Sequence, residues 1–127
     1  MANQFSKHYT REEARELLPQ ITEWLRQVEV LRAAMRKHDQ RVEALMDAGM
    51  DRGGQTVNDW VRTMADLQHV LGEFQSRGIL IKDLDRGLID FPAIIGGKEV
   101  FLCWEKGEDD IEFWHDLESG YSGREPI

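Results

Sequence analysis

A regular heptad spacing of apolar residues constrains this chain more than any other feature of its sequence. The steps alternate between four and three residues without a break, in two stretches separated by the Gly-rich residues 48–55. The first stretch is Leu17, Ile21, Trp24, Val28, Leu31, Met35, His38, Val42 and Leu45, and the second is Val57, Trp60, Met64, Leu67, Leu71 and Phe74. A 3.5-residue repeat is typical of helices that pack along a seam. The sequence therefore predicts an antiparallel helical hairpin over residues 10–77.

The ends of this hairpin carry recognisable helix signals. Thr10 and Glu13 have the spacing of a capping box, in which each side chain bonds the other residue's backbone N–H. Pro19 lacks a backbone N–H, so we expect a kink there, or a short helix followed by a longer one. Gly78 stands where a left-handed C-terminal cap belongs. Because the first stretch is the longer, its N-terminal end should overhang the second and pack on the C-terminal segment.

In that C-terminal segment the apolar period changes to the strand value of two. Strand patterns cover residues 79–81, 88–95, 98–105 and 111–116, and Gly96-Gly97 gives a strong two-residue hairpin signal. We predict a small three- to four-stranded antiparallel β-meander over residues 79–127. The chain, residues 1–127, is then a single α+β domain with the helical hairpin packed on the sheet.

The charge of the chain belongs mostly to the predicted sheet. The formal net charge is −8, and residues from Ile79 onward hold five basic and twelve acidic side chains, a net of −7. An acidic chain argues against nucleic acid as the main partner. The sequence has no apolar run of the roughly 20 residues that a membrane helix needs, and its first residues do not resemble a signal peptide. With a single cysteine as well, we expect a soluble cytoplasmic protein that does not bind membranes.

The Gly96-Gly97 turn fixes a register that places Asp90 opposite Cys103, next to Glu105. Directly opposed side chains lie roughly 4.5–5.5 Å apart at Cβ. A carboxylate among apolar neighbours costs free energy unless it is paired or binds a cation. Two interpretations stay open at this point. Asp90 belongs to a metal or acid/base site, or it forms a structural ion pair with Lys82 or Arg124 while Cys103 is an inert core thiol.

The register of the last predicted strand decides where His115 lies. If Glu105 pairs with Asp110, His115 falls opposite Val100 on the apolar core face. A one-residue shift, which a bulge would allow, moves His115 to the face of Asp90. Carboxylate and imidazole ligands suit Zn, Fe or Mn. The predicted metal ligands are Asp90, Glu108 and His115, with Asp83, Cys103 and Glu105 near them, and Lys82 and Arg124 as candidate binding residues.

Two other functional interpretations are not favoured by the residues. The segment Asp83–Gly87 has glycine at the fifth position instead of the sixth that an EF-hand loop requires, so we predict a turn. Cys103 is not expected to be a nucleophile, because adjacent acids raise its pKa and suppress the thiolate.

Several short motifs spread over the chain resemble a family of short bacterial and archaeal proteins known only as a domain of unknown function. They are Phe5, Thr10-x-Glu12-Glu13-Ala14-x-x-Leu17-Leu18-Pro19, Gly78-x-x-x-Lys82-Asp83, Gly87-Leu88-Ile89-Asp90-Phe91-Pro92, Val100-Phe101-Leu102-Cys103-Trp104, Gly107-Glu108, Trp114-His115 and Gly120-Tyr121-x-Gly123-Arg124-x-Pro126-Ile127. The resemblance implies a bacterial or archaeal cytoplasmic protein. It implies no activity, ligand or catalytic residue.

Two functions are compatible with these features. The first is a binding or assembly module that forms a homodimer, because one helical hairpin covers only one of two apolar sheet faces. This module could carry a divalent metal on its acidic sheet and could have another protein as partner. The second is a metal-dependent enzyme of unknown reaction that uses a carboxylate/His site.

Overall fold

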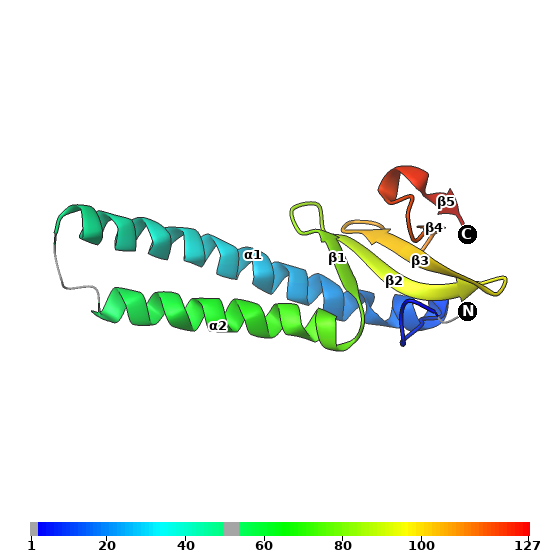
Figure 1. Cartoon of the computed structure of the whole chain (residues 1–127), viewed down its shortest axis with the longest axis horizontal. Coiled ribbons are helices and arrows are strands. Elements are labelled where there is room, and N and C mark those ends of the chain that lie inside the picture. Colours follow the sequence, from blue (N-terminus) through cyan, green and yellow to red (C-terminus); the bar gives the residue numbers. More distant parts are fainter. Residues whose placement is uncertain (1–2, 50–53) are drawn as a thin grey trace. The chain divides into compact units, whose positions relative to one another are not determined.

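The computed structural model describes residues 3–49 and 54–127. Its two helices, α1 (Arg11–Asp47) and α2 (Gly54–Ser76), precede five strands and a short 3-10 helix, η1 (Tyr121–Gly123), so the chain is α+β as predicted (Figure 1). The chain forms two compact units. One unit is the chain up to Thr22 together with Phe74–Ile127, and the other is Glu23–Glu73. Of the predicted loop at 48–55, residues 50–53 lie outside the described residues. No helix in the described ranges is long and apolar enough to cross a membrane.

All five strands form one antiparallel meander in the order of the chain (Figure 1). They are β1 (Leu80–Asp83), β2 (Leu88–Ile95), β3 (Lys98–Glu105), β4 (Phe113–Asp116) and β5 (Glu125–Pro126). The sequence predicted three to four strands. The additional strand, β5, is only two residues long, which is too short to show an alternating pattern.

The β2–β3 hairpin has the predicted register at every pair, including Asp90 opposite Cys103 and Phe91 opposite Leu102. Gly96 and Gly97 have φ angles of 58° and 78°. A two-residue turn with positive φ at both positions matches the twist of its flanking strands, and glycine adopts that conformation without strain. The turn therefore sets which side chains meet across β2 and β3.

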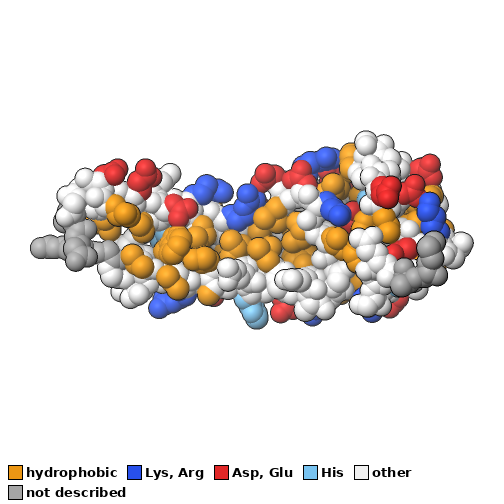
Figure 2. Space-filling view, in the orientation of Figure 1, with side chains coloured by type: hydrophobic (Ala, Val, Ile, Leu, Met, Phe, Trp, Pro, Cys, Tyr) orange, Lys and Arg blue, Asp and Glu red, His pale blue; other side chains and the backbone are white. Residues whose placement is uncertain are grey.

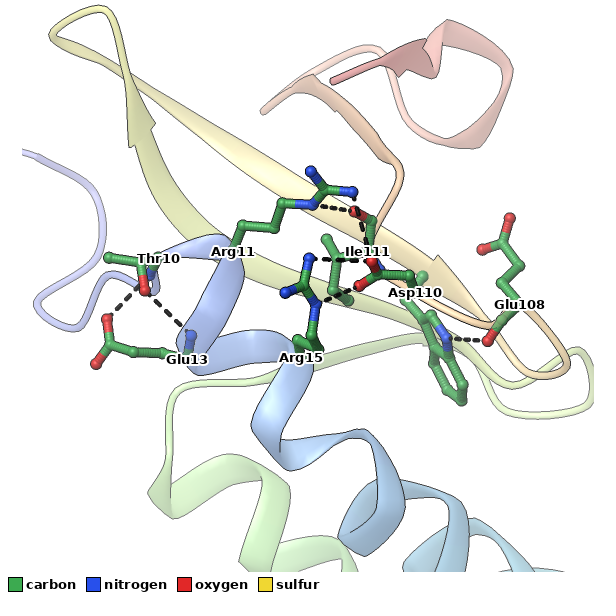
Figure 3. Close-up of polar contacts among 8 residues, drawn as sticks. Thr10, Arg11, Glu13, Arg15, Glu108, Asp110 and Ile111 are labelled. Carbon is green, nitrogen blue, oxygen red and sulfur yellow. Dashed lines mark hydrogen bonds and ion pairs between the residues drawn. The ribbon is translucent and has the colours of Figure 1, made fainter.

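The first turn of α1 is tied to the loop before β4 (Figure 3). The predicted capping box forms, with Glu13 N donating to Thr10 Oγ1 at 3.1 Å and Thr10 N donating to Glu13 Oε1 at 3.0 Å. Arg15 donates twice to the Asp110 carboxylate, at 2.8 and 3.0 Å, and Arg11 Nε donates to the Ile111 carbonyl at 2.7 Å. The overhanging end of the first helix thus contacts the C-terminal segment, as predicted.

Helix α1 does not divide at Pro19, so of the two alternatives expected there, a kink or two helices, the second is not observed. The helix runs without interruption from Arg11 to Asp47 with Pro19 inside it. A proline removes one backbone hydrogen bond, and a long helix retains the bonds on either side of it. One turn further on, Thr22 Oγ1 donates to the Leu18 carbonyl at 2.8 Å.

Within the unit Glu23–Glu73, α1 and α2 pack as the predicted antiparallel hairpin. Trp60 Nε1 donates to Asp39 Oδ1 at 2.7 Å between the two helices. Val42 and Trp60, predicted to be neighbours on the seam, line the same groove. The seam residues from Leu31 toward the loop are only half-buried. Two helices alone therefore cover this stretch of apolar surface incompletely.

Both faces of the central strands are buried. Phe91 and Leu102 lie on one face, and Phe101 and Cys103 on the other. The second face is covered by the N-terminal segment and by the residues after β4. The Phe5 ring packs on Phe101 at 5.3 Å between centroids, and Arg124 lies over the Phe113 ring at 3.9 Å from its centre. In the part of the chain that the structure describes, the sheet therefore lacks the uncovered apolar face from which the sequence led us to expect a homodimer.

Candidate metal centre

Three neighbouring strands each contribute one polar side chain to a single buried cluster. Asp90 on β2, Cys103 on β3 and His115 on β4 each offer a ligand atom, and these atoms lie within 4.8 Å of one another. The three residues are 1%, 0% and 2% exposed. A carboxylate, a thiol and an imidazole therefore share one small volume shielded from solvent.

Strand pairing explains why Asp90 and Cys103 meet. Pro92 has no N–H, and its carbonyl accepts a hydrogen bond from Tyr9 N at 2.7 Å on the side of β2 away from β3. The N–H and C=O groups of successive residues in a strand point in opposite directions. Asp90, two residues before Pro92, therefore also directs its N–H and C=O away from β3. The pair of Asp90 and Cys103 is then a non-hydrogen-bonded pair, the type in which opposed side chains approach most closely.

The β3–β4 register places His115 beside Asp90. His115 pairs with Phe101, one residue away from the register that would set it opposite Val100. Of the two alternatives that the sequence left open, the shifted register is therefore the one observed. The shift arises in the loop before β4, where Ile111 is fully buried. The Ile111 carbonyl accepts a hydrogen bond from Arg11, and the Ile111 N–H donates one to the Asp110 carboxylate. Strand β4 consequently begins at Phe113, two residues later than predicted.

Hydrogen bonds fix the protons of the cluster. His115 Nδ1 lies 2.6 Å from the Asp116 carbonyl oxygen, which can only accept, so Nδ1 carries a proton and donates it. His115 Nε2 lies 3.1 and 3.0 Å from the two carboxylate oxygens of Asp90. Two lone pairs would repel at this distance, so one proton lies between the imidazole and the carboxylate. The Cys103 sulfur lies within 4.8 Å of both ligand groups.

Burial dominates the electrostatics of the cluster. It raises the pKa of Asp90, and the opposing effects of His115, the Cys103 thiol and Lys82 only reduce that rise. Burial, followed by the charge of Asp90, raises the pKa of Cys103 to about 12. Cys103 is therefore a protonated thiol at neutral pH and a poor nucleophile, in line with the sequence-based expectation.

The strands that carry this cluster lie in the part of the chain that matches a protein-family model. A family model described as an uncharacterized conserved protein (DUF2203) matches residues 7–127. The chain belongs to the DUF2203 family. This confirms the resemblance to a family of unknown function noted in the sequence. Neither the curated proteins nor the solved structures include a match to the chain.

In this DUF2203 chain, the predicted ligand Glu108 lies outside the cluster. Its Oε1 accepts a hydrogen bond from Glu105 N at 2.6 Å, and its Oε2 accepts one from Arg124 at 2.6 Å. The two carboxylates expected nearby also have protein partners. Glu105 accepts from Arg86 Nε at 2.8 Å, and Asp83 Oδ1 accepts from Arg86 N at 3.1 Å within the predicted turn.

The two candidate binding cations flank the cluster at its rim. Lys82 Nζ lies 4.9 Å from the centre of the Phe101 ring, and its charge acts on Asp90. Arg124 lies over the rings of Phe113 and Tyr121, at 3.9 and 4.6 Å from their centres. Both cations therefore stack on aromatic rings, and Arg124 also pairs with Glu108.

The sequence predicts Glu108 as a ligand and Cys103 only as a neighbour of the site. In the structure Cys103 lies in the cluster and Glu108 does not. The signal for Cys103 was present, because the two-glycine turn sets it directly opposite Asp90. No pattern in the sequence predicts the contact of Phe5 with Phe101. Phe5 lies close to Phe101 only because the N-terminal segment folds back along the sheet.

Proposed function

We propose that the protein is a metal-binding module whose centre consists of Asp90, Cys103 and His115, and that the metal is zinc. The observation that carries this proposal is the convergence of three different ligand types within 4.8 Å at a buried point of the sheet. Thiolate and imidazole favour zinc or iron, whereas sites built from oxygen ligands favour manganese. Zinc also accepts a tetrahedral arrangement with few geometric demands.

The hydrogen-bonding pattern of His115 is the one that metal-bound histidines have. Such a histidine donates its second ring N–H to a carboxylate or a backbone carbonyl, which fixes the ring orientation. Here Nδ1 donates to the Asp116 carbonyl, which leaves Nε2 facing Asp90. Two ligand atoms on a tetrahedral zinc lie roughly 3.3–3.7 Å apart, given zinc–ligand distances of about 2.0–2.3 Å. The Nε2 and carboxylate oxygens therefore need to separate by only a few tenths of an ångström.

Charge balance also favours a divalent ion at this point. The cluster holds one proton on the Cys103 thiol and one between Asp90 and His115, so its net charge is zero. A divalent cation bound by a thiolate, a carboxylate and a neutral imidazole also gives a net charge of zero. Exchanging two protons for one such ion therefore adds no net charge to the buried site, which is the change that a low-dielectric interior tolerates best.

The burial of the cluster favours a structural role for the metal. A catalytic zinc site keeps one position open to water or substrate, whereas a structural ion contributes directly to folding. All three side chains here are almost completely buried. The ligand count supports the alternative, a metal-dependent enzyme, because three protein ligands leave the fourth zinc position for water. We also propose a cytoplasmic location, because a single reduced cysteine fits a reducing compartment.

Thermal unfolding with zinc separates this proposal from an ordinary buried ion pair. A ligand that binds only the folded state raises Tm, by an amount that grows with its concentration relative to Kd. We expect zinc to raise the Tm of the wild-type protein and of Glu108→Gln, and to leave the Tm of Cys103→Ser unchanged. Serine keeps a donor for Asp90, so Cys103→Ser removes the soft ligand with little change in shape. A zinc response that survives in Cys103→Ser but disappears in Glu108→Gln would contradict the proposed ligand set.

Self-association is a second function, supported by apolar surface on the helical hairpin. Val30, Met46, Val57 and Val61 are 56%, 74%, 41% and 50% exposed. Met46 and Val57 line a groove of about 390 Å³ that also contains Val42 and Trp60. In the view of Figure 2, apolar side chains lie along the junction of the two helices of the hairpin. A second hairpin would complete a four-helix bundle and bury the half-exposed seam, so the proposed partner is a second copy of the chain.

Light scattering tests self-association directly. We expect the wild-type protein to have the mass of a dimer, and Met46→Lys/Val57→Lys to have the mass of a monomer with an unchanged zinc response. The matched control Arg62→Glu alters an exposed charge on the same helix and should leave the dimer intact. A monomeric wild-type protein at about 100 μM would contradict this second function.

A further inference from the structure

The N-terminal segment lies across the face of the sheet that contains the metal centre. Residues 4–9 precede α1, and at their far end Tyr9 packs on the opposite face, with its ring 5.4 Å from that of Phe91. Phe5 packs on the ligand face, against Phe101. The segment passes from one face to the other beside Pro92, along the part of β2 that β1 does not pair with. We refer to residues 4–9 as the strap.

One carboxylate holds the strap on the ligand face. Glu99 accepts hydrogen bonds from Gln4 N at 2.7 Å and from Phe5 N at 3.0 Å, and its Oε2 lies 2.7 Å from His8 Nε2. Glu99, Phe101 and Cys103 are every second residue of β3, so their side chains point to the same face of the sheet. Three groups of the strap therefore converge on a single side chain.

The strap connects to the centre through two aromatic contacts. The Phe5 ring meets Phe101 edge-on, with centroids 5.3 Å apart. Phe101 in turn lies 5.4 Å from the imidazole of His115, opposite it in the β3–β4 pairing. Phe5 thus covers the ring that borders the ligand histidine.

The C-terminal tail covers the same face but has more attachments. Strand β5 pairs with β4, and Ile127 N donates to the Glu112 carbonyl at 2.9 Å. Arg124 lies over two rings and pairs with Glu108. By contrast, the described strap residues that lie on this face are attached through Glu99 and the Phe5 ring. Segments with few attachments open at the lowest free energy, so the strap is the weaker of the two covers.

We propose that the strap is the lid of the metal centre, and that its release from Glu99 admits the ion to Asp90, Cys103 and His115. This inference rests on the proposed function in naming the ion. The opening itself does not require metal, because Cys103 is the only cysteine of the chain and reports access to the cluster. The thiol is fully buried, so a reagent in solution does not reach it while the lid is closed.

The test is the rate at which N-ethylmaleimide modifies Cys103 in the folded, full-length protein. Glu99→Ala and Phe5→Ala should each increase this rate by about tenfold or more, because they remove contacts that exist only in the closed form. Glu118→Ala removes the same charge from an exposed residue that lines the same surface groove as Glu99, and should leave the rate unchanged. Tyr121→Ala, which loosens the tail, should have a smaller effect than either strap variant.

The urea dependence of the labelling rate separates lid opening from unfolding. Opening of a short segment exposes little surface, so the faster labelling of Glu99→Ala should depend weakly on urea below the unfolding transition. A steep dependence in that variant would mean that the whole protein unfolds before reacting. Either this result, or faster labelling in Tyr121→Ala than in Glu99→Ala, would overturn the assignment of the strap as the lid.

Zinc uptake by the same variants connects the lid to the proposed function. In stopped-flow measurements with zinc and a competing fluorescent chelator, Glu99→Ala should load zinc about tenfold faster than the wild type and to the same final occupancy. If no variant takes up zinc while the strap variants still label faster, the metal centre fails and the lid remains. If zinc binds at equal rates in all variants, the lid fails and the metal centre remains.

Discussion

His115 Nε2 lies 3.0 Å from Oδ2 of Asp90, and both side chains are almost completely buried. In the interior, an ion pair gains from Coulomb attraction but also loses the hydration of both charges, so its net contribution to folding is small. The presence of a buried pair is therefore weak evidence for a stabilising role and stronger evidence for a chemical one. Here the thiol of Cys103 completes a set of three metal-ligand types beside it.

Proton release on zinc binding tests the charge balance of the centre. We expect about two protons to leave per zinc ion, one from the Cys103 thiol and one from between Asp90 and His115. Isothermal titration in two buffers with different ionisation enthalpies gives this number directly. Release near zero would show that the ion binds elsewhere on the acidic surface, where the carboxylates are already ionised.

Removal of one or both members of the buried pair should have very different consequences. Asp90→Val leaves a buried histidine without its partner and should lower the free energy of unfolding by about 3–5 kcal/mol. Asp90→Val/His115→Leu removes both polar groups and should recover most of that loss. Chemical denaturation gives both values. Neither variant should show a zinc-dependent rise in Tm, and a response in the double variant would contradict the ligand assignment.

Asp110 should make stability depend on acid pH. Hydrogen bonds from Arg15, and then from Ile111 N, hold the pKa of Asp110 below its ordinary value of 3.8. A carboxyl whose pKa is lowered by folding stabilises the protein above its unfolded pKa, and this contribution is lost as the pH falls through the lower, folded pKa. Asp110→Asn should therefore be less stable than the wild type at pH 7, and the gap should narrow below about pH 4. Urea unfolding at pH 7 and pH 3 measures the difference in unfolding free energy between the wild type and Asp110→Asn. Asp109→Asn is the neighbouring exposed control.

The capping box should contribute measurably to α1. Thr10→Ala removes the side-chain acceptor for Glu13 N and should lower the free energy of unfolding by about 1 kcal/mol. Gln20→Ala changes an exposed position on the same helix and should stay within about 0.5 kcal/mol of the wild type. Equal losses in the two variants would show that the cap has no particular role.

The parts of the fold that the sequence predicted are those in which local rules set the geometry. The heptad seam from Leu17 to Phe74 specifies the hairpin because each side chain's face follows from its position in the repeat. Gly96 and Gly97 specify the β2–β3 register because a two-residue turn leaves no freedom in strand alignment. The sequence therefore predicts that Asp90 and Cys103 lie opposite one another, as they do.

The remaining features depend on contacts between distant segments. The loop before β4 has no fixed length, so the position of His115 depended on how Arg11 and Arg15 hold Ile111 and Asp110, about 100 residues away in the chain. The pairing of Glu108 with Arg124, which keeps Glu108 out of the cluster, is also non-local. Local patterns do not encode these pairings.

The metal content of the purified protein tests the central claim most directly. Untagged wild-type protein and Cys103→Ser would be incubated with zinc, passed over a chelating resin to remove loosely held ions, and analysed by plasma mass spectrometry. We predict close to one zinc per chain in the wild type and close to none in Cys103→Ser. A wild-type protein without zinc, or a Cys103→Ser variant that retains it, would contradict a metal centre at Asp90, Cys103 and His115.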